Sequence, residues 1–235
     1  LNDIIDFLFV SKYKEKGNKA INSFKYIKVI PNKNTNNTCS SGFFQNDFIK
    51  YVIIDKKTKT ISGATFCSCI NLKKVIIPFG IENIGNFAFS NCFKLKSINL
   101  PKSLKYLGSN VFEDFLNLEK INIPNTISKI EEYTFCNCSN LVYIELPDTI
   151  TEIGGYVFSD CYKLNSFVLP PTIKEINSHM FHKCYNIKEL NIHNITRNNV
   201  TDTIINYYGS RNVDTRNYGY YGTSQNYLQS GYDCP

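Results

Sequence analysis

One phenylalanine recurs along the chain at a constant 23-residue interval, and this interval limits the possible folds more than any other feature. The positions are Phe66, Phe89, Phe112, Phe135, Phe158 and Phe181. A fixed period of this length is typical of solenoids, in which each repeat is one coil and neighbouring coils stack on each other. The sequence therefore predicts a stacked array rather than a domain with one closed core.

Other residues keep the same register as the phenylalanines. Each coil holds an alternating apolar segment, which a proline follows in all coils but the last, as Pro101 follows Ile98-Asn99-Leu100; in the last coil His193 takes that place. Alternation with period two predicts a short strand with one inward face, and proline ends the strand because it cannot donate to a ladder. Gly85, Gly108 and Gly154 mark the next corner, where a positive φ or close packing is expected. The following step to phenylalanine is expected to be a turn of helix.

The combined pattern, I-x-x-I-G-x-x-A-F-x-x-C-x-x-L-x-x-I-x-L-P, resembles the BspA-like (Treponema pallidum type) leucine-rich repeat over residues 50–196. The resemblance implies an α/β solenoid, a right-handed and β-rich leucine-rich-repeat array of about six 23-residue coils. It also implies a role in adhesion or protein binding. The family is widespread in bacteria and in parasitic protists, and the Asn- and Lys-rich composition is similar to a protist protein of the Entamoeba or Trichomonas type.

The segments outside this array differ from it in composition. Residues 1–30 place apolar side chains at helical spacing, which predicts a helical cap over the open end of the array. The stretch DFLFVSKYKEK also resembles part of an F-box helical pair, which would make the segment an adaptor instead. Residues 31–49 predict a polar loop. Residues 197–235, rich in Tyr, Asn and Gly, predict a flexible tail, with an adhesive or phosphorylatable segment as the alternative.

The charge distribution bears on the kind of partner. Residues 1–60 hold eleven lysines against five acidic residues, whereas residues 61–196 hold twelve of each. A nucleic-acid-binding face needs a basic stripe with aromatic platforms, so the neutral array argues against nucleic acid as a partner. No apolar run reaches the roughly 18 residues of a transmembrane helix. The apolar Ile4–Val10 segment lacks a basic region before it and a cleavage site after it, so a secretory signal is not expected.

The cysteines form a second ladder in the sequence. Three residues after the recurring phenylalanine stand Cys69, Cys92, Cys138, Cys161 and Cys184, with Phe115 in the remaining coil. These thiols are expected to be buried against the backbone of the turn. Zinc needs four converging ligands, whereas a ladder sets thiols in a line, so no metal and no cofactor are predicted. Reduced thiols and a cytoplasmic location are favoured, and disulfides at the cell surface are the alternative.

The sequence offers no recognisable catalytic group. His179, His182 and His193 are the only histidines, and none has an evident Ser or Cys partner. Paired carboxylates such as Glu131-Glu132 lie at predicted corners near lysines, as solvated surface does. The chain is therefore not expected to be an enzyme.

The remaining candidate is a binding surface formed by the outward residues of the main strand. They make two columns, of which the first is Lys74, Ser97, Lys120, Tyr143, Ser166 and Glu189, and the second is Ile76, Asn99, Asn122, Glu145, Val168 and Asn191. Such columns are expected to line the concave sheet, the usual binding face of solenoids. Tyr143 with Val168 is the predicted anchor. The predicted function is a non-enzymatic scaffold or adaptor that binds a protein, and the alternative is a surface adhesin for host or matrix proteins.

Overall fold

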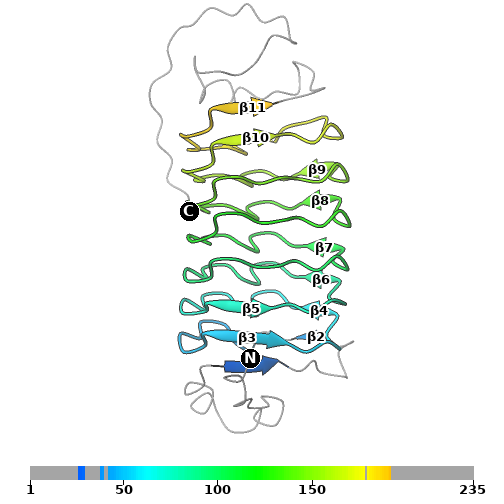
Figure 1. The fold of residues 1–235 in the computed structure, drawn as a ribbon, viewed down its shortest axis with the longest axis vertical. Helices are drawn as coiled ribbons and strands as arrows, with labels where there is room; N and C mark the ends of the chain where they lie inside the picture. The colour runs from blue at the N-terminus through cyan, green and yellow to red at the C-terminus, as the bar shows by residue number, and fades with distance from the viewer. Residues whose placement is uncertain (1–25, 30–37, 40–41, 178, 192–235) are drawn as a thin grey trace, which may run out of the picture.

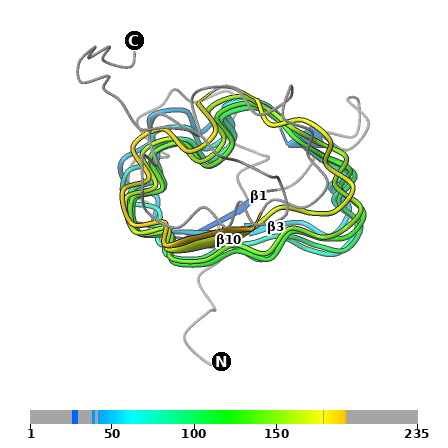
Figure 2. The same cartoon turned by 90° about the horizontal axis from the view of Figure 1, so that it is seen from above.

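The chain folds into a stack of similar coils. The computed structural model describes residues 26–29, 38–39, 42–177 and 179–191. Figure 1 shows these coils one above another along the long axis, in the order of the sequence. Figure 2 looks along the stack, where the coils superpose on one closed outline. The apolar side chains that alternate along each coil fill this outline and form one continuous core.

Two rows of short parallel strands run up the stack. The main-strand row contains β1 (Tyr26–Val29), β3 (Tyr51–Ile54), β5 (Lys74–Ile76), β10 (Ser166–Val168) and β11 (Glu189–Asn191). Between β5 and β10 the row includes a single parallel bridge from Asn122 to Glu145. The second row contains β2 (Thr38–Cys39), β4 (Thr60–Ile61), β6 (Asn83–Ile84), β7 (Tyr106–Leu107), β8 (Lys129–Ile130) and β9 (Glu152–Ile153).

The strand pairs confirm the 23-residue register. Val75 in β5 pairs with Val52 in β3, and Leu107 in β7 pairs with Ile84 in β6, each one interval apart. The first coil departs from this interval, because β1 pairs Ile27 with Val52 and β2 pairs Thr38 with Thr60. The first of these separations is longer than the interval and the second is shorter, so the two strands of the first coil do not stand out in the sequence.

The recurring phenylalanines form a ladder of stacked rings through the core. Ring centroids of successive coils are 5.4–6.2 Å apart, with interplanar angles of at most 19°. The ladder begins one coil earlier than predicted, since Phe43 stacks on Phe66 at 5.5 Å. Phe43 stands one full interval before Phe66, and the sequence therefore carried the signal for it.

The helical turn predicted at the phenylalanine is wrong. The backbone enters the left-handed region two residues before the ring and two residues after it, as at Tyr133 (φ 56°) and Asn137 (φ 55°) around Phe135. Both columns recur at the 23-residue interval. A right-handed helix needs negative φ at every residue, so the segment forms consecutive turns, and the described residues contain no helix.

The helical cap predicted for residues 1–30 is also wrong where the structure describes it. Tyr26–Val29 is strand β1, which adds to the edge of β3. Its apolar residues alternate with Tyr26 and Lys28, and the unpaired backbone edge of β3 gains hydrogen bonds from this addition. Residues 1–25 lie outside the described part, as does the predicted tail from residue 197. Strand β2 falls inside the segment predicted as a polar loop.

The corner glycines are explained by close packing rather than by positive φ. A Cβ on Gly85 would lie 2.5 Å from the Gly63 nitrogen, and one on Gly154 would lie 2.6 Å from the Glu132 nitrogen. Neither glycine has a positive φ. Since the opposing atoms are backbone atoms of the adjacent coil, no side-chain movement can make room.

Gly85→Ala should therefore lower the free energy of unfolding by about 1–3 kcal/mol, the range of an overpacked core. Chemical denaturation measures this change. Gly42→Ala is the matched control, because no atom lies within 4 Å of its added Cβ. We expect the control to change the free energy of unfolding by less than about 0.5 kcal/mol. Equal effects of the two substitutions would contradict the assigned contact between coils.

Candidate protein-binding face

The cysteine ladder holds neighbouring turns together. The Sγ of Cys69 donates to the carbonyl of Phe43 at 3.0 Å, and that of Cys138 donates to the carbonyl of Phe112 at 3.2 Å. The equivalent bond to a carbonyl of the preceding coil is made by Cys92, Cys161 and Cys184. All five thiols are buried, and none of them forms a disulfide. Burial raises the pKa of the Cys69 thiol to about 12, which keeps it protonated and makes it a poor nucleophile.

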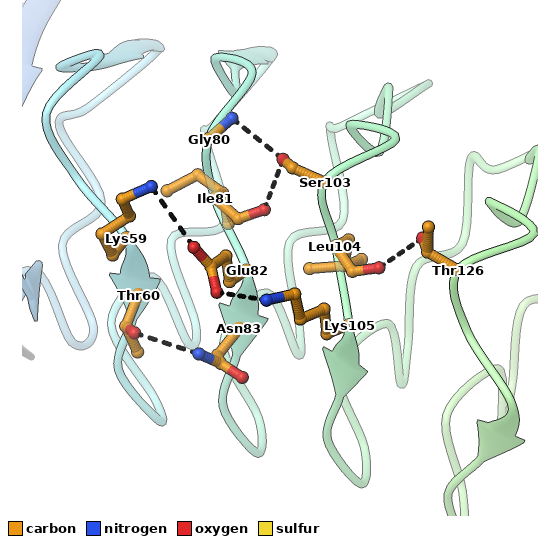
Figure 3. Close-up of polar contacts among 10 residues, drawn as sticks. All are labelled: Lys59, Thr60, Gly80, Ile81, Glu82, Asn83, Ser103, Leu104, Lys105 and Thr126. Carbon is orange, nitrogen blue, oxygen red and sulfur yellow. Dashed lines mark hydrogen bonds and ion pairs between the residues drawn. The ribbon is translucent and has the colours of Figure 1, made fainter.

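Charged side chains along the second strand row form ion pairs with one another. Glu82 lies between two lysines of the adjacent coils, with Lys59 Nζ at 3.3 Å and Lys105 Nζ at 2.8 Å (Figure 3). The hydrogen bonds from Lys105 and Lys59 lower the pKa of Glu82. Higher in the stack, Lys129 lies 2.9 Å from Glu152 and 3.2 Å from Glu131. The charged groups of this row thus find partners within the chain, mostly one coil away.

The hydroxyl groups at the corner before this row also form hydrogen bonds within the chain. Ser103 Oγ donates to the Ile81 carbonyl at 2.7 Å and accepts the Gly80 amide at 2.9 Å (Figure 3). Thr126 and Thr149, at the equivalent positions of later coils, donate to the carbonyls of Leu104 and Ile127. These hydroxyls are structural, since each closes a hydrogen bond between successive coils.

The main-strand row presents a different surface. We call the two predicted columns, with Lys73 and Lys96 that precede the strands, the main-strand face. Ile76, Tyr143 and Val168 in these columns are 45%, 44% and 53% exposed. Lys74, Ser97, Asn99, Lys120, Asn122 and Glu145 are also exposed, and Ser166 is half-buried. The structure thus places these ten residues outward, as the alternation predicted.

Polar groups on this face are left without partners among the described residues. Of the ten side chains placed outward, only that of Ser166 makes a hydrogen bond there, from its Oγ to Asn165 Oδ1 at 3.2 Å. The lysines of the face make no ion pair with the described residues, in contrast to those of the second row. Glu189 and Asn191 are placed by backbone alone, opposite Ser166 and Val168 in the pairing of β10 with β11.

Sequence reasoning missed part of the exposed apolar surface beside this face. Phe79 follows the proline that ends β5 and is 78% exposed, the largest fraction among the exposed large hydrophobic residues described. It is flanked at the equivalent corner positions, one repeat to either side, by Lys56 and Lys102. Its exposure could have been predicted from its place after the proline that ends the strand, because the alternation of inward and outward side chains does not continue past that proline.

The two described histidines lie on the turn around Phe181, next to a column of stacked aromatic rings from the equivalent turns. His179 stacks on Tyr156 with ring centroids 4.6 Å apart, and Tyr156 stacks on Tyr133 at 5.0 Å. His182 meets His179 edge-on at 5.9 Å, and burial lowers the pKa of His182. The stacked rings join neighbouring coils. His193 lies outside the described residues.

The described part of the chain contains no group of three or more His, Cys, Asp or Glu residues that is arranged to hold a metal ion. Nor does that part contain a helix of the length and hydrophobicity needed to span a bilayer.

Comparison with solved structures identifies proteins with the same coil. A leucine-rich repeat protein from Bacteroides ovatus is 27% identical, with a TM-score of 0.68 over 73% of this chain and 46% of that protein. The leucine-rich repeat protein of T. pallidum is 29% identical, with a TM-score of 0.58 over 63% of this chain and 70% of that protein. A Eubacterium ventriosum leucine-rich repeat protein is 27% identical, with a TM-score of 0.62 over 71% of this chain and 45% of that protein.

The chain thus spans less than half the length of the B. ovatus and E. ventriosum proteins. No curated protein matches it significantly. The family model for the BspA type leucine-rich repeat region matches residues 37–125 and 107–208, with six copies of the repeat. These matches cover more than half of the sequence and include the described coils from residue 42 to residue 191. The chain belongs to the BspA-type leucine-rich repeat family.

Proposed function

We propose that this protein is a non-enzymatic interaction module, a scaffold or adaptor, that binds a protein partner on the main-strand face. The observation that carries the proposal is the contrast between the two strand rows. Lysines of the second row reach acidic groups of adjacent coils, whereas the described polar groups of the main-strand face are exposed and, apart from Ser166, without partners. Exposed apolar side chains stand among them.

The centre of the binding surface is Tyr143 with Val168, which lie on adjacent coils. Each of these side chains is roughly half exposed and is surrounded by polar or charged neighbours on the same face. Large apolar groups with a polar rim are typical of interface hot spots, because a partner excludes water from them at small entropic cost. Tyr143 in particular offers a ring and a hydroxyl that makes no hydrogen bond with the described residues.

Tyr143→Ala should weaken partner binding by at least about tenfold, the effect of truncating a hot-spot residue. The partner is first captured with a photo-crosslinking residue at position 99, and capture from position 128 on the second row is the background. Binding is then titrated with the purified partner. Tyr106→Ala is the matched control, since Tyr106 lies on the second row and is 42% exposed against 44% for Tyr143.

Both variants should keep the thermal stability of the original protein within about 2 °C, as changes at exposed positions usually do. If Tyr106→Ala weakened binding as much as Tyr143→Ala, the main-strand face would not be the site. Unchanged binding by the Tyr143 variant would also remove the proposal.

A cell-surface adhesin for host or matrix proteins would use the same face, and the state of the thiols separates the two roles. The seven cysteines from Cys67 to Cys184 are buried and form no disulfide with one another, which supports the adaptor. Thiol labelling of protein from its native cell, before and after denaturation, tests this. Thiols that react only after denaturation support the adaptor, and thiols that react only after added reductant support the adhesin.

A further inference from the structure

The array is electrically polarised along its length. Residues 42–105 hold ten lysines against three acidic residues, whereas residues 106–191 hold six lysines against eleven. Figure 1 shows that chain order follows the stack, so the positive half is the N-terminal half of the coils. The balanced total of residues 61–196 had concealed this separation.

Within the positive half, part of the unpaired charge lies on the main-strand face. Lys59 and Lys105 on the second row both bind Glu82, and Lys94 Nζ donates to Asn71 Oδ1 at 2.5 Å. By contrast, the ammonium groups of Lys73, Lys74 and Lys96 make no hydrogen bond or ion pair with the described residues. All three are exposed. Their charges are therefore available to a ligand.

Apolar surface lies beside these lysines. Ile76 projects from β5 two residues after Lys74, and Phe79 follows three residues later at the corner, between Lys56 and Lys102 of the adjacent coils. The corner and the strand thus combine an aliphatic group, an aromatic ring and lysines. Adjacent coils are about 4.8 Å apart, so three coils span roughly 10–15 Å. That length fits about three or four residues of an extended polypeptide, at about 3.3 Å per residue.

We propose that the N-terminal half of the main-strand face binds an acidic polypeptide segment, with an apolar side chain seated against Ile76 and Phe79. This inference rests on the proposed protein-binding function of the face. Carboxylates of the segment pair with Lys73, Lys74 and Lys96. A polypeptide fits better than nucleic acid, because Phe79 is the only large exposed aromatic described in the patch, while binding of single strands relies on successive stacking platforms.

The test selects ligands without assuming their charge. A library of random twelve-residue peptides is displayed and selected on the full chain. The selected peptides should be enriched in Asp and Glu with an aromatic or aliphatic residue among them. One such peptide is then synthesised together with a counterpart in which each acidic residue is replaced by Lys. The acidic peptide should bind, and its affinity should fall as salt is raised, since screening shortens the reach of exposed charges.

A pair of triple variants assigns the binding to the patch. The test variant carries Lys73→Ser, Lys74→Ser and Lys96→Ser, and the control carries Lys59→Ser, Lys94→Ser and Lys105→Ser in the same half of the array. Both lose the same formal charge. The test variant should bind the acidic peptide at least about tenfold more weakly, and the control should stay within about twofold, because specific pairing and not net charge supplies the affinity. Phe79→Ala should weaken binding while leaving its salt dependence unchanged.

Other outcomes would overturn the inference in distinguishable ways. If the binding of the selected peptides depends on Tyr143 but the peptides are not enriched in acidic residues, the proposal of an acidic ligand is wrong. The proposal that the main-strand face binds proteins is then kept. If no peptide depends on any residue of the face, both proposals fail. Vesicles containing phosphatidylserine and a short single-stranded DNA are titrated in parallel. If the test variant lost the binding of vesicles or DNA but kept the binding of the peptide, the patch would be a site for that ligand and not for a polypeptide.

Discussion

Phe135→Ala is expected to lower the free energy of unfolding by about 3–5 kcal/mol, the usual cost of truncating a buried aromatic residue. The Phe135 ring is fully buried and stacks between Phe112 at 5.6 Å and Phe158 at 5.7 Å. Its loss leaves a cavity between two rings. The backbone on either side is held by left-handed turns, which bond to the next coil and limit collapse into the space.

Denaturant unfolding at constant pH measures this loss. Phe79→Ala is the matched control, because the same truncation at a 78% exposed ring removes little buried surface. We expect the control to change the free energy of unfolding by less than about 0.5 kcal/mol. A loss below about 1 kcal/mol at Phe135 would show that the ring ladder does not stabilise the central coils.

The second large effect is expected at alkaline pH. Burial raises the pKa of the thiols of Cys92, Cys138 and Cys161 well above the ordinary value of 9.0, and that of Cys69 to about 12. In the unfolded chain these thiols ionise near pH 9, while in the folded chain they keep their protons. The folded state therefore binds more protons above pH 9, and raising the pH favours unfolding.

The stabilising effect of these protonated thiols is fully present below pH 9 and is lost as the pH rises toward the folded pKa values. Each thiol contributes a slope of about 1.4 kcal/mol per pH unit once the unfolded thiol is ionised, so four thiols give about 5.5 kcal/mol per unit. Urea unfolding at pH 7, 8, 9 and 10 in the presence of reductant measures the slope.

Cys161→Ala is the control for this assignment. It removes one of the four titrating thiols and should reduce the alkaline slope by about 1.4 kcal/mol per pH unit, whatever it does to the stability at pH 7. Other groups with raised pKa values, such as Tyr162 and Lys129, are unchanged in this variant and cannot account for the difference. A stability that stays constant from pH 8 to pH 10 would contradict the burial of the ladder thiols.

Part of the fold could be read from the sequence because equivalent residues of a solenoid stack on each other. The interval between Phe66 and Phe89 is the same as the interval between the paired Val52 and Val75. The five ladder cysteines were placed correctly against turn carbonyls for the same reason. The strands of the first coil escaped notice because β1 and β2 stand at two other separations from their partners, although Phe43 of the same coil keeps the interval.

The conformation of the phenylalanine turn was harder to predict. Asn110, Asp114 and Asn137 adopt positive φ, as Asn and Asp do readily. Phe87, Tyr133 and Tyr156 adopt it too, although their side chains give no such indication. At these positions the backbone hydrogen bonds to the next coil, such as Phe87 nitrogen to the Ser109 carbonyl at 2.9 Å, impose the turn. A backbone hydrogen bond between residues of different coils cannot be predicted from the local sequence.

The sequence by itself determined the repeat, its length, the inward residues of each strand and the family, since all of these follow from side chains recurring at one interval. Only the tertiary structure decided which charges are available to a partner. Lys59 and Lys74 look alike in the sequence, yet Lys59 reaches Glu82 on the adjacent coil and Lys74 meets no acidic group among the described residues. The physical reason is that stacking sets the neighbours of each side chain one coil away, and these neighbours decide whether its charge is neutralised.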